Sequence, residues 1–372
     1  MRQNIITAGD NYRELDEWIN ERGARKILLV CRGAVNRMES FQKHLEELEK
    51  HVEIIKFSAY QSNPLYESAA AGVVMFRMQS CDAIIAAGGG STMDVAKCIK
   101  LFSNMRGEGE DGGYLKQKIV PNTIPFLAMP TTAGSGSEAT RYAVIYYLGE
   151  KQSIMSESFI PDTVLMDSGC LETLPAYQKK VSMLDAFCHA LESFWSINST
   201  DESKRYSRDA IGMILENMEG YLANTDDGNR NMLMASYMAG KAINIAQTTA
   251  GHAMCYKITG LFGIAHGHAA ILCDRALFSR MIQNKDKCID PRGEEYLERI
   301  LLEIAHAMGE RTAKDAAEKI GEIFDRLKLD IPTASRAQFE ELKMSVNPVR
   351  LKNHPVELSV NTIDMLYHKI LR

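Results

Sequence analysis

The residues best suited to chemistry are one aspartate and three histidines in the second half of the chain. Asp185 and His189 are four apart, so on a helix they project from the same face. Two further histidines follow at His252 and His266. One carboxylate and three imidazoles suit Fe²⁺ or Zn²⁺ and leave a coordination position open for a substrate oxygen. An Asp–His pair at this spacing is also common by chance, so the metal interpretation depends on the other motifs.

A run of three glycines, Gly88–Gly90, precedes Ser91 and Asp94. It follows an apolar segment typical of a buried strand and opens a pattern typical of a helix. Glycines let a ligand approach the backbone closely, and a helix N-terminus offers N–H groups to a phosphate. The motif predicts a pyrophosphate site, although a plain tight turn has the same composition. It is not the G-x-G-x-x-G pattern of the ordinary dinucleotide fingerprint.

A second loop, Pro130–Glu138, is rich in glycine and hydroxyl groups. It follows an apolar segment and contains Thr131, Thr132 and Ser135. These hydroxyls can hydrogen-bond a ribose or a carboxamide. Taken alone, a loop of this kind is more often a plain surface loop.

The elements that must position these motifs differ between the two halves of the chain. In the first half, short apolar runs alternate with helical patterns, which predicts a parallel sheet with helices on both faces. The predicted strands are 26–31, 52–57, 83–87 and 126–129, and the predicted helices are 37–52, 66–81 and 93–102.

After about Pro175, long helical patterns dominate and strand signals nearly vanish. The predicted helices there are 181–195, 203–222, 229–247, 296–308 and 313–327. The sequence therefore predicts an α/β dinucleotide-binding domain over residues 1–172 and an all-α domain over residues 173–372.

Composition excludes several classes of protein. A net charge of −5 with 24% charged residues argues against a nucleic-acid partner. No apolar run reaches transmembrane length, and the N-terminus lacks the apolar core of a signal peptide. The eight cysteines show no paired spacing, so a reduced, cytoplasmic protein without disulfides is expected.

The motifs together resemble one family. Gly88–Lys97, Pro130–Glu138, Asp185–His189 and His252–Gly267 occur in the order and spacing of iron-containing, group III alcohol dehydrogenases, and the resemblance covers nearly the whole chain. It implies a Rossmann-like α/β domain, an all-α metal-binding domain and a metal-dependent interconversion of a small aldehyde and its primary alcohol. It also implies Fe²⁺ or Zn²⁺ as the metal and NADPH or NADH as the cofactor.

The resemblance assigns roles to individual residues by motif position. The metal ligands it implies are Asp185, His189, His252 and His266. The cofactor contacts it implies are Asn63, Gly89, Gly90, Ser91, Asp94, Thr131, Thr132, Ser135, Thr140 and Lys151.

Two positions bear on proton transfer and on the choice of cofactor. The family usually has a histidine, a candidate for proton transfer, where this chain has Tyr256. Tyr256 is therefore a candidate catalytic residue, and water or a ribose hydroxyl of the cofactor is the alternative carrier of the proton. Arg32 follows the first strand of the cofactor fold, where relatives that favour NADH often have an acidic residue. An arginine there would attract the 2′-phosphate of NADPH, so a preference for NADPH is predicted. An exposed arginine without a ligand is the alternative.

Two cations adjoin the motifs in the sequence and suggest the substrate. Arg141 and Lys257 lie in the strings 139–144 and 252–257, which resemble the branch of the family that reduces phosphonoacetaldehyde to 2-hydroxyethylphosphonate. A dianionic phosphonate would find a charged partner in each. Alternatively, Arg141 is a structural ion-pair residue and Lys257 a solvated one.

Other interpretations stay open. Arg275 and Arg350 are further cationic candidates. Glycerol and sugar-phosphate dehydrogenases share the architecture, usually with zinc, so a general or polyol alcohol dehydrogenase is an alternative. A dehydroquinate-synthase-like lyase would be expected to need more basic residues in the site, and a non-enzymatic metal-binding protein is a third alternative. A homodimer that acts on a small molecule, without nucleic-acid or membrane partners, is expected.

Overall fold

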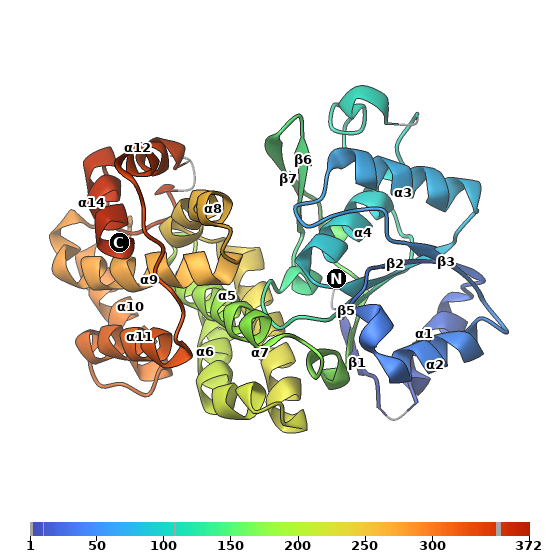
Figure 1. The fold of residues 1–372 in the computed structure, drawn as a ribbon, viewed down its shortest axis with the longest axis horizontal. Coiled ribbons are helices and arrows are strands. Elements are labelled where there is room, and N and C mark those ends of the chain that lie inside the picture. The colour runs from blue at the N-terminus through green and yellow to red at the C-terminus, as the bar shows by residue number, and fades with distance from the viewer. Residues whose placement is uncertain (1–2, 10, 108, 347–350) are drawn as a thin grey trace. The chain divides into compact units, whose positions relative to one another are not determined.

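A computed structural model describes residues 3–9, 11–107, 109–346 and 351–372 of the chain. The chain divides into two compact units, Met1–Leu174 (unit 1) and Pro175–Arg372 (unit 2). The division falls two residues beyond the boundary expected from the sequence. Figure 1 shows unit 1 in blue to green and unit 2 from green through yellow to red.

Unit 1 is built on a six-stranded sheet in which every neighbouring pair is parallel, as predicted. In the order in which they lie side by side, the strands are β1 (Asn4–Thr7), β8 (Thr163–Met166), β5 (Phe126–Pro130), β4 (Ala83–Gly88), β2 (Lys26–Cys31) and β3 (Glu53–Phe57).

Helices cover both faces of this sheet (Figure 1). Alternate residues of β2 point to opposite faces, because successive side chains of a strand do so. Ile27 and Leu29 pack in the core that holds helices α1 and α2, whereas Leu28 and Val30 pack in the core that holds α3 and α4. The bounds of these helices are α1 (Arg13–Arg22), α2 (Glu39–Leu48), α3 (Tyr66–Met78) and α4 (Gly90–Phe102).

Four strands of unit 1 are not among the strands predicted from the sequence. Two of them, β1 and β8, have only four residues each, which is too short for a periodic signal. The other two, β6 (Tyr142–Tyr147) and β7 (Glu150–Met155), form an antiparallel hairpin outside the main sheet. Helix α4 also begins three residues earlier than predicted, because Gly89 is its N-cap.

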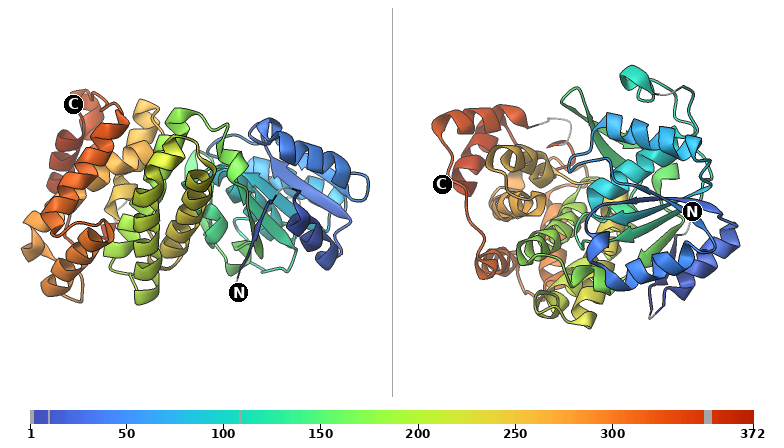
Figure 2. Two further views of the ribbon diagram at one scale, coloured as in Figure 1. Left: turned by 90° about the horizontal axis from the view of Figure 1, so that it is seen from below. Right: turned by 45° about the vertical axis from the view of Figure 1, so that its right-hand side comes forward.

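Unit 2 contains helices and no β-strand among its described residues, as predicted (Figure 2). Its helices are α5 (Ala176–Trp195), α6 (Asp201–Leu222), α7 (Asp226–Ala246), α8 (Ala250–Phe262), α9 (His266–Gln283), α10 (Glu294–Ala307), α11 (Ala313–Leu327), α12 (Arg336–Ser345) and α14 (Val360–Ile370). Helix α5 is the centre of the unit: it packs against α6, α7 and α9, and every residue from Met183 to Trp195 is buried. A helix that is buried all round holds its polar side chains in fixed positions.

All eight cysteines are free thiols, and seven of them are buried. Among the described residues, no helix is both long enough and apolar enough to cross a membrane.

Candidate active site

Three of the four predicted metal ligands lie together in the interior of unit 2. Asp185 and His189 project from one face of α5, and His252 comes from the first turn of α8. One ligand atom from each residue lies within 4.8 Å of the others. All three residues are buried. The i, i+4 spacing in the sequence therefore does place a carboxylate and an imidazole at one point.

The fourth predicted ligand, His266, adjoins this group from the first residue of α9. Its ring centroid lies 5.1 Å from that of His252, although its nitrogen atoms are not part of the 4.8 Å group. Gly267 allows this approach, since a Cβ there would lie 2.0 Å from the carbonyl oxygen of Val181 on α5. The ring of Tyr256, which occupies the expected histidine position, lies 5.0 Å from the ring of His266.

The group leaves two buried polar atoms without hydrogen bonds. Asp185 Oδ1 and His252 Nε2 lie 3.5 Å apart, which is too long for a strong hydrogen bond. Neither atom has a hydrogen-bond partner within the described part of the chain, and neither is accessible to solvent. Orphaned polar atoms of this kind are costly in a protein interior. A carboxylate oxygen and an imidazole nitrogen directed at one point fit a divalent cation.

The charges in the group are strongly coupled. Burial alone would raise the pKa of Asp185, but the neighbouring histidines outweigh it and hold that pKa well below its usual range. Burial alone would lower the pKa of His252, but Glu192 and Asp185 together raise it to about 10. Without a cation, the interior therefore favours an ionised aspartate and a protonated histidine.

A glutamate that sequence reasoning missed holds His252 in place. Glu192 lies on α5, seven residues after Asp185, and is completely buried. Its Oε2 accepts hydrogen bonds from the backbone N–H and the hydroxyl of Thr249, at 2.5 and 2.7 Å. Its Oε1 accepts from the backbone N–H of His252 at 3.0 Å and pairs with His252 Nδ1. Glu192 thus caps the start of α8 and leaves His252 Nε2 to face Asp185.

A second buried acid lies close to Glu192. Burial, together with the nearby charge of Glu192, raises the pKa of Asp274 well above its usual value. A Cβ at Gly251 would lie 1.7 Å from Asp274 Oδ1 and 2.8 Å from Glu192 Oε1, so only glycine fits between them. The protonated form of Asp274 is therefore favoured beside the charge of Glu192.

In unit 1, the two loops predicted separately form one surface. Gly89 and Gly90 begin α4, and a Cβ on either would lie 3.2 Å from Thr132 Oγ1 or Ser135 Oγ, respectively. The backbone N–H of Thr131 donates to the carbonyl of Gly88 at 3.1 Å. Ser91 lies in the first turn of the helix. The structure thus brings a helix N-terminus and several hydroxyls together, as a pyrophosphate site requires.

A buried lysine on α4 holds the end of the Pro130–Glu138 loop and the segment that follows it through hydrogen bonds to their backbone. Lys97 Nζ donates to the carbonyls of Ser137, Thr140 and Tyr142 at 2.6, 2.8 and 2.8 Å. Burial lowers the pKa of Lys97 to about 8, and the charge of Asp94 opposes that shift. Thr140, predicted as a cofactor contact, is buried here and serves as an acceptor for Lys97.

Three other residues predicted to contact the cofactor, Asp94, Asn63 and Arg32, differ in their surroundings. Burial raises the pKa of Asp94 to about 6, with the charges of Lys97 and Lys151 acting against it. Asn63 has a left-handed backbone, with φ of 55°. Arg32 is exposed after β2, with its guanidinium 5.6 Å from the centre of the Tyr60 ring.

The predicted substrate cations both have acidic partners. Arg141, in unit 1, pairs with Glu157 at 2.7 Å, and Lys257, in unit 2, pairs with Glu341 at 2.5 Å. Of the further candidates, Arg275 lies over the ring of Phe324 at 4.5 Å. Arg350 lies outside the described residues.

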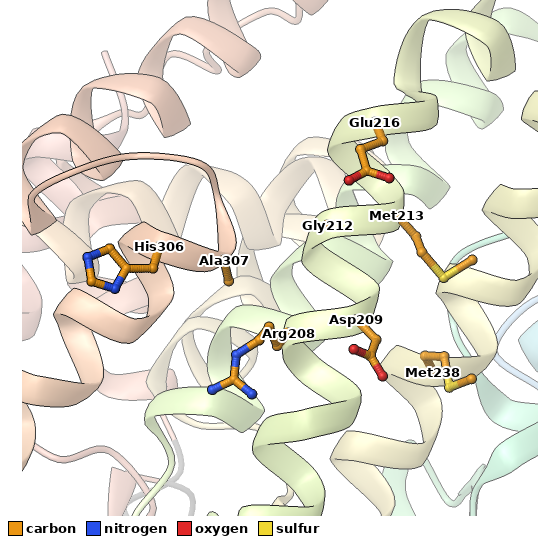
Figure 3. A pocket seen from close by; sticks show the side chains of 8 residues that line it. All are labelled: Arg208, Asp209, Gly212, Met213, Glu216, Met238, His306 and Ala307. Atoms are coloured by element: carbon orange, nitrogen blue, oxygen red, sulfur yellow. The ribbon is translucent and has the colours of Figure 1, made fainter.

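A hollow of about 540 Å³ lies elsewhere in unit 2, away from the candidate metal ligands. It is lined by residues of α6, α7 and α10, including Arg208, Asp209 and His306 (Figure 3). None of the predicted metal ligands lines it. This hollow is therefore separate from the buried Asp185–His189–His252 group.

Both halves of the chain match models of a single family. Residues 3–168 match iron-containing alcohol dehydrogenase, and residues 180–351 match the C-terminal part of the Fe-containing alcohol dehydrogenase family. Together the two matches cover most of the chain.

Individual proteins of known activity agree with these matches. A phosphonoacetaldehyde reductase of Streptomyces viridochromogenes is 30% identical over 67% of this chain, and the match spans 66% of that protein, just under two thirds of it. A 1,3-propanediol dehydrogenase of Klebsiella pneumoniae is 30% identical over 83% of this chain and 79% of that protein.

The fold is shared with solved structures. A sulfoacetaldehyde reductase of Bifidobacterium kashiwanohense, in complex with NAD⁺, superposes with a TM-score of 0.87 at 24% identity, over 99% of this chain and 96% of that one. An iron-containing alcohol dehydrogenase of Thermococcus thioreducens gives a TM-score of 0.86 at 22% identity, over 100% and 98%. With both family models matched and 30% identity to a propanediol dehydrogenase, this chain belongs to the iron-containing alcohol dehydrogenase family, the NAD-linked oxidoreductases of alcohols and aldehydes.

Proposed function

We propose that the protein interconverts a small aldehyde and its primary alcohol, with Asp185, His189, His252 and His266 holding one divalent metal, Fe²⁺ or Zn²⁺. The observation that carries this proposal is the buried Asp185–His189–His252 group, in which two facing polar atoms lack hydrogen bonds. A metal there would supply Lewis-acid polarisation of the substrate oxygen, and a nicotinamide would supply or accept the hydride.

The protein's own residues prepare the site for that chemistry. Glu192 accepts from His252 Nδ1, so Nε2 of the same ring is the nitrogen left for a ligand. The surrounding burial excludes water from the ligands. Tyr256, whose ring is tilted against that of His266, would border the substrate, and a water or a cofactor ribose hydroxyl would carry the proton.

For the cofactor, we propose that the pyrophosphate binds at Gly89, Gly90 and Ser91, where the N-terminus of α4 meets the hydroxyls of the Pro130–Glu138 loop. The exposed guanidinium of Arg32, just past β2, supports a preference for NADPH, because it would offer a partner to a 2′-phosphate.

For the substrate, we propose phosphonoacetaldehyde, reduced to 2-hydroxyethylphosphonate. The proposal is supported by the strings around Arg141 and Lys257 and by the similarity to the Streptomyces phosphonoacetaldehyde reductase. An anionic head that reaches Lys257 would have to displace or share Glu341, its present partner.

The pairing of these cations with glutamates favours a second candidate function. Since Arg141 and Lys257 are each already neutralised by a glutamate, the chain could act as a general or polyol alcohol dehydrogenase on neutral substrates. The similarity to a 1,3-propanediol dehydrogenase agrees with this alternative.

The first prediction concerns the metal. We expect His266→Ala to weaken metal affinity by more than about 100-fold, since even a lost supporting hydrogen bond costs ~10–100-fold. Turnover should fall with metal content, measured by elemental analysis, while far-ultraviolet circular dichroism stays unchanged. His306→Ala, which removes an exposed histidine of α10, serves as the control. Full activity after exhaustive chelation, with no metal left, would contradict the proposal.

The second prediction concerns the cofactor. Wild-type protein should show higher kcat/KM with NADPH than with NADH. Arg32→Asp should shift the ratio towards NADH by roughly 10- to 100-fold, because a charge-assisted hydrogen bond contributes about 1.5–3 kcal/mol. Arg37→Asp, an exposed arginine a few residues further on, should leave the ratio unchanged. A clear preference of the wild-type protein for NADH would refute the assignment.

The third prediction separates the two substrate candidates. Phosphonoacetaldehyde should be reduced with a higher kcat/KM than propanal or lactaldehyde. Lys257→Ala should raise its KM on the order of tenfold or more and leave the neutral aldehydes unaffected. Lys314→Ala, which breaks an exposed lysine–glutamate pair on α11, controls for a change of surface charge. If the neutral aldehydes are reduced equally well, the general alcohol dehydrogenase is the correct candidate.

A further inference from the structure

Unit 1 contains a hollow of about 500 Å³ that is separate from the proposed cofactor loops. Most of its lining comes from Gln3 and from residues within 121–125 and 157–162, and Arg22 and Lys100 complete it. These segments lead directly into β1, β5 and β8. Because the sheet is parallel, the amino ends of these strands share one edge, whereas Gly88–Gly90 lies at a carboxyl end. The hollow therefore lies at the opposite edge of the sheet.

A buried lysine faces neutral groups in the lining of this hollow. Lys100 is only 5% exposed. Its Nζ donates to the carbonyl and the hydroxyl of Ser158, at 2.8 and 3.0 Å, and to the carbonyl of Asn122 at 3.3 Å. Within the described part of the chain, Lys100 makes no salt bridge. Burial lowers its pKa to about 8, and only the charge of Asp162 acts against that shift. Three neutral acceptors match the three N–H groups of this ammonium but leave its charge uncompensated, so an anion would be attracted and would take the place of the longest contact, the one with Asn122.

The acids that line the hollow are already engaged. Asp162 Oδ1 accepts from Trp18 Nε1 at 2.9 Å and pairs with Arg22 at 3.3 Å. Glu157 pairs with Arg141. Arg22, whose side chain is 36% exposed, also lines the hollow and already pairs with Asp162 and Glu21, so a ligand anion would share its guanidinium with those acids.

Most of the remaining lining is apolar. It is formed by Pro121, Ile124, Pro125, Ile160 and Pro161. A volume of this size lies within the ~300–1,000 Å³ of small-molecule sites, which are mostly apolar with a few placed polar groups. We propose that the hollow is a second ligand site, which takes a medium-chain aliphatic monocarboxylic acid. Its carboxylate is directed at Lys100 and Arg22, and its hydrocarbon chain packs on the prolines and isoleucines.

Hexanoate is the probe that tests this site, with binding measured by isothermal titration calorimetry on the full-length, metal-loaded protein. Binding should be about tenfold weaker or more in Lys100→Met, because a charge-assisted hydrogen bond contributes about 1.5–3 kcal/mol. Arg22→Gln should also weaken it. Lys116→Met, which removes an exposed lysine outside the hollow, should leave it unchanged. Hexanamide, which has the same chain and no charge, should bind far more weakly.

An excess of NADPH distinguishes this site from the proposed cofactor loops, because hexanoate should still bind in its presence. Displacement of hexanoate by NADPH would overturn the proposal. So would equal binding to the wild type, Lys100→Met and Arg22→Gln, or the absence of binding at millimolar hexanoate. If Lys100→Met lowers the thermal midpoint so far that it cannot be titrated, the partly exposed Arg22→Gln decides the test alone.

Discussion

The candidate metal centre depends on one buried carboxylate. Glu192 accepts bonds from two backbone N–H groups and a hydroxyl in the first turn of α8, and it pairs with His252 Nδ1. A helix N-terminus favours such an anion, and the same interaction orients an imidazole. Since Glu192 lies on α5 together with Asp185 and His189, one helix carries two candidate ligands and fixes the third.

The electrostatics of unit 2 follow from this arrangement. Glu192 is ionised because His252, Thr249 and the start of α8 lower its pKa against the effect of burial. Burial and the charge of Glu192 both raise the pKa of Asp274, which favours its protonated form. The negative charge of Asp185 lies 3.5 Å from His252 Nε2 and is also close to His189. A divalent cation would take the place of the proton on that histidine.

Local patterns in the sequence predicted much of the fold and several residues of the candidate site. The features that they missed depend on contacts between segments distant in the sequence. The i, i+4 pair on α5, the glycine turn and most of the buried strands follow from spacing and composition alone. The contact of Gly89 with Thr132 joins loops distant in sequence, and no local pattern encodes it. Glu192 lies on the same helical face as Asp185, but acids on helices are usually solvated, so spacing alone gave it no role. Arg141 and Lys257 were predicted as substrate contacts because they adjoin the motifs in the sequence. Proximity in the sequence does not show that each has a glutamate partner.

The most direct test compares two isosteric changes, Glu192→Gln and Asp274→Asn, by the affinity of the metal-free protein for Fe²⁺ or Zn²⁺. The glutamine amide cannot accept all four bonds that Glu192 accepts, so affinity should fall by ~10–100-fold. The asparagine replaces an acid whose raised pKa favours the neutral form, so affinity should stay close to that of the wild type. Unfolding in urea of both metal-free variants controls for a general loss of stability. Wild-type affinity in Glu192→Gln, or an equal loss in both variants, would contradict the central role of Glu192.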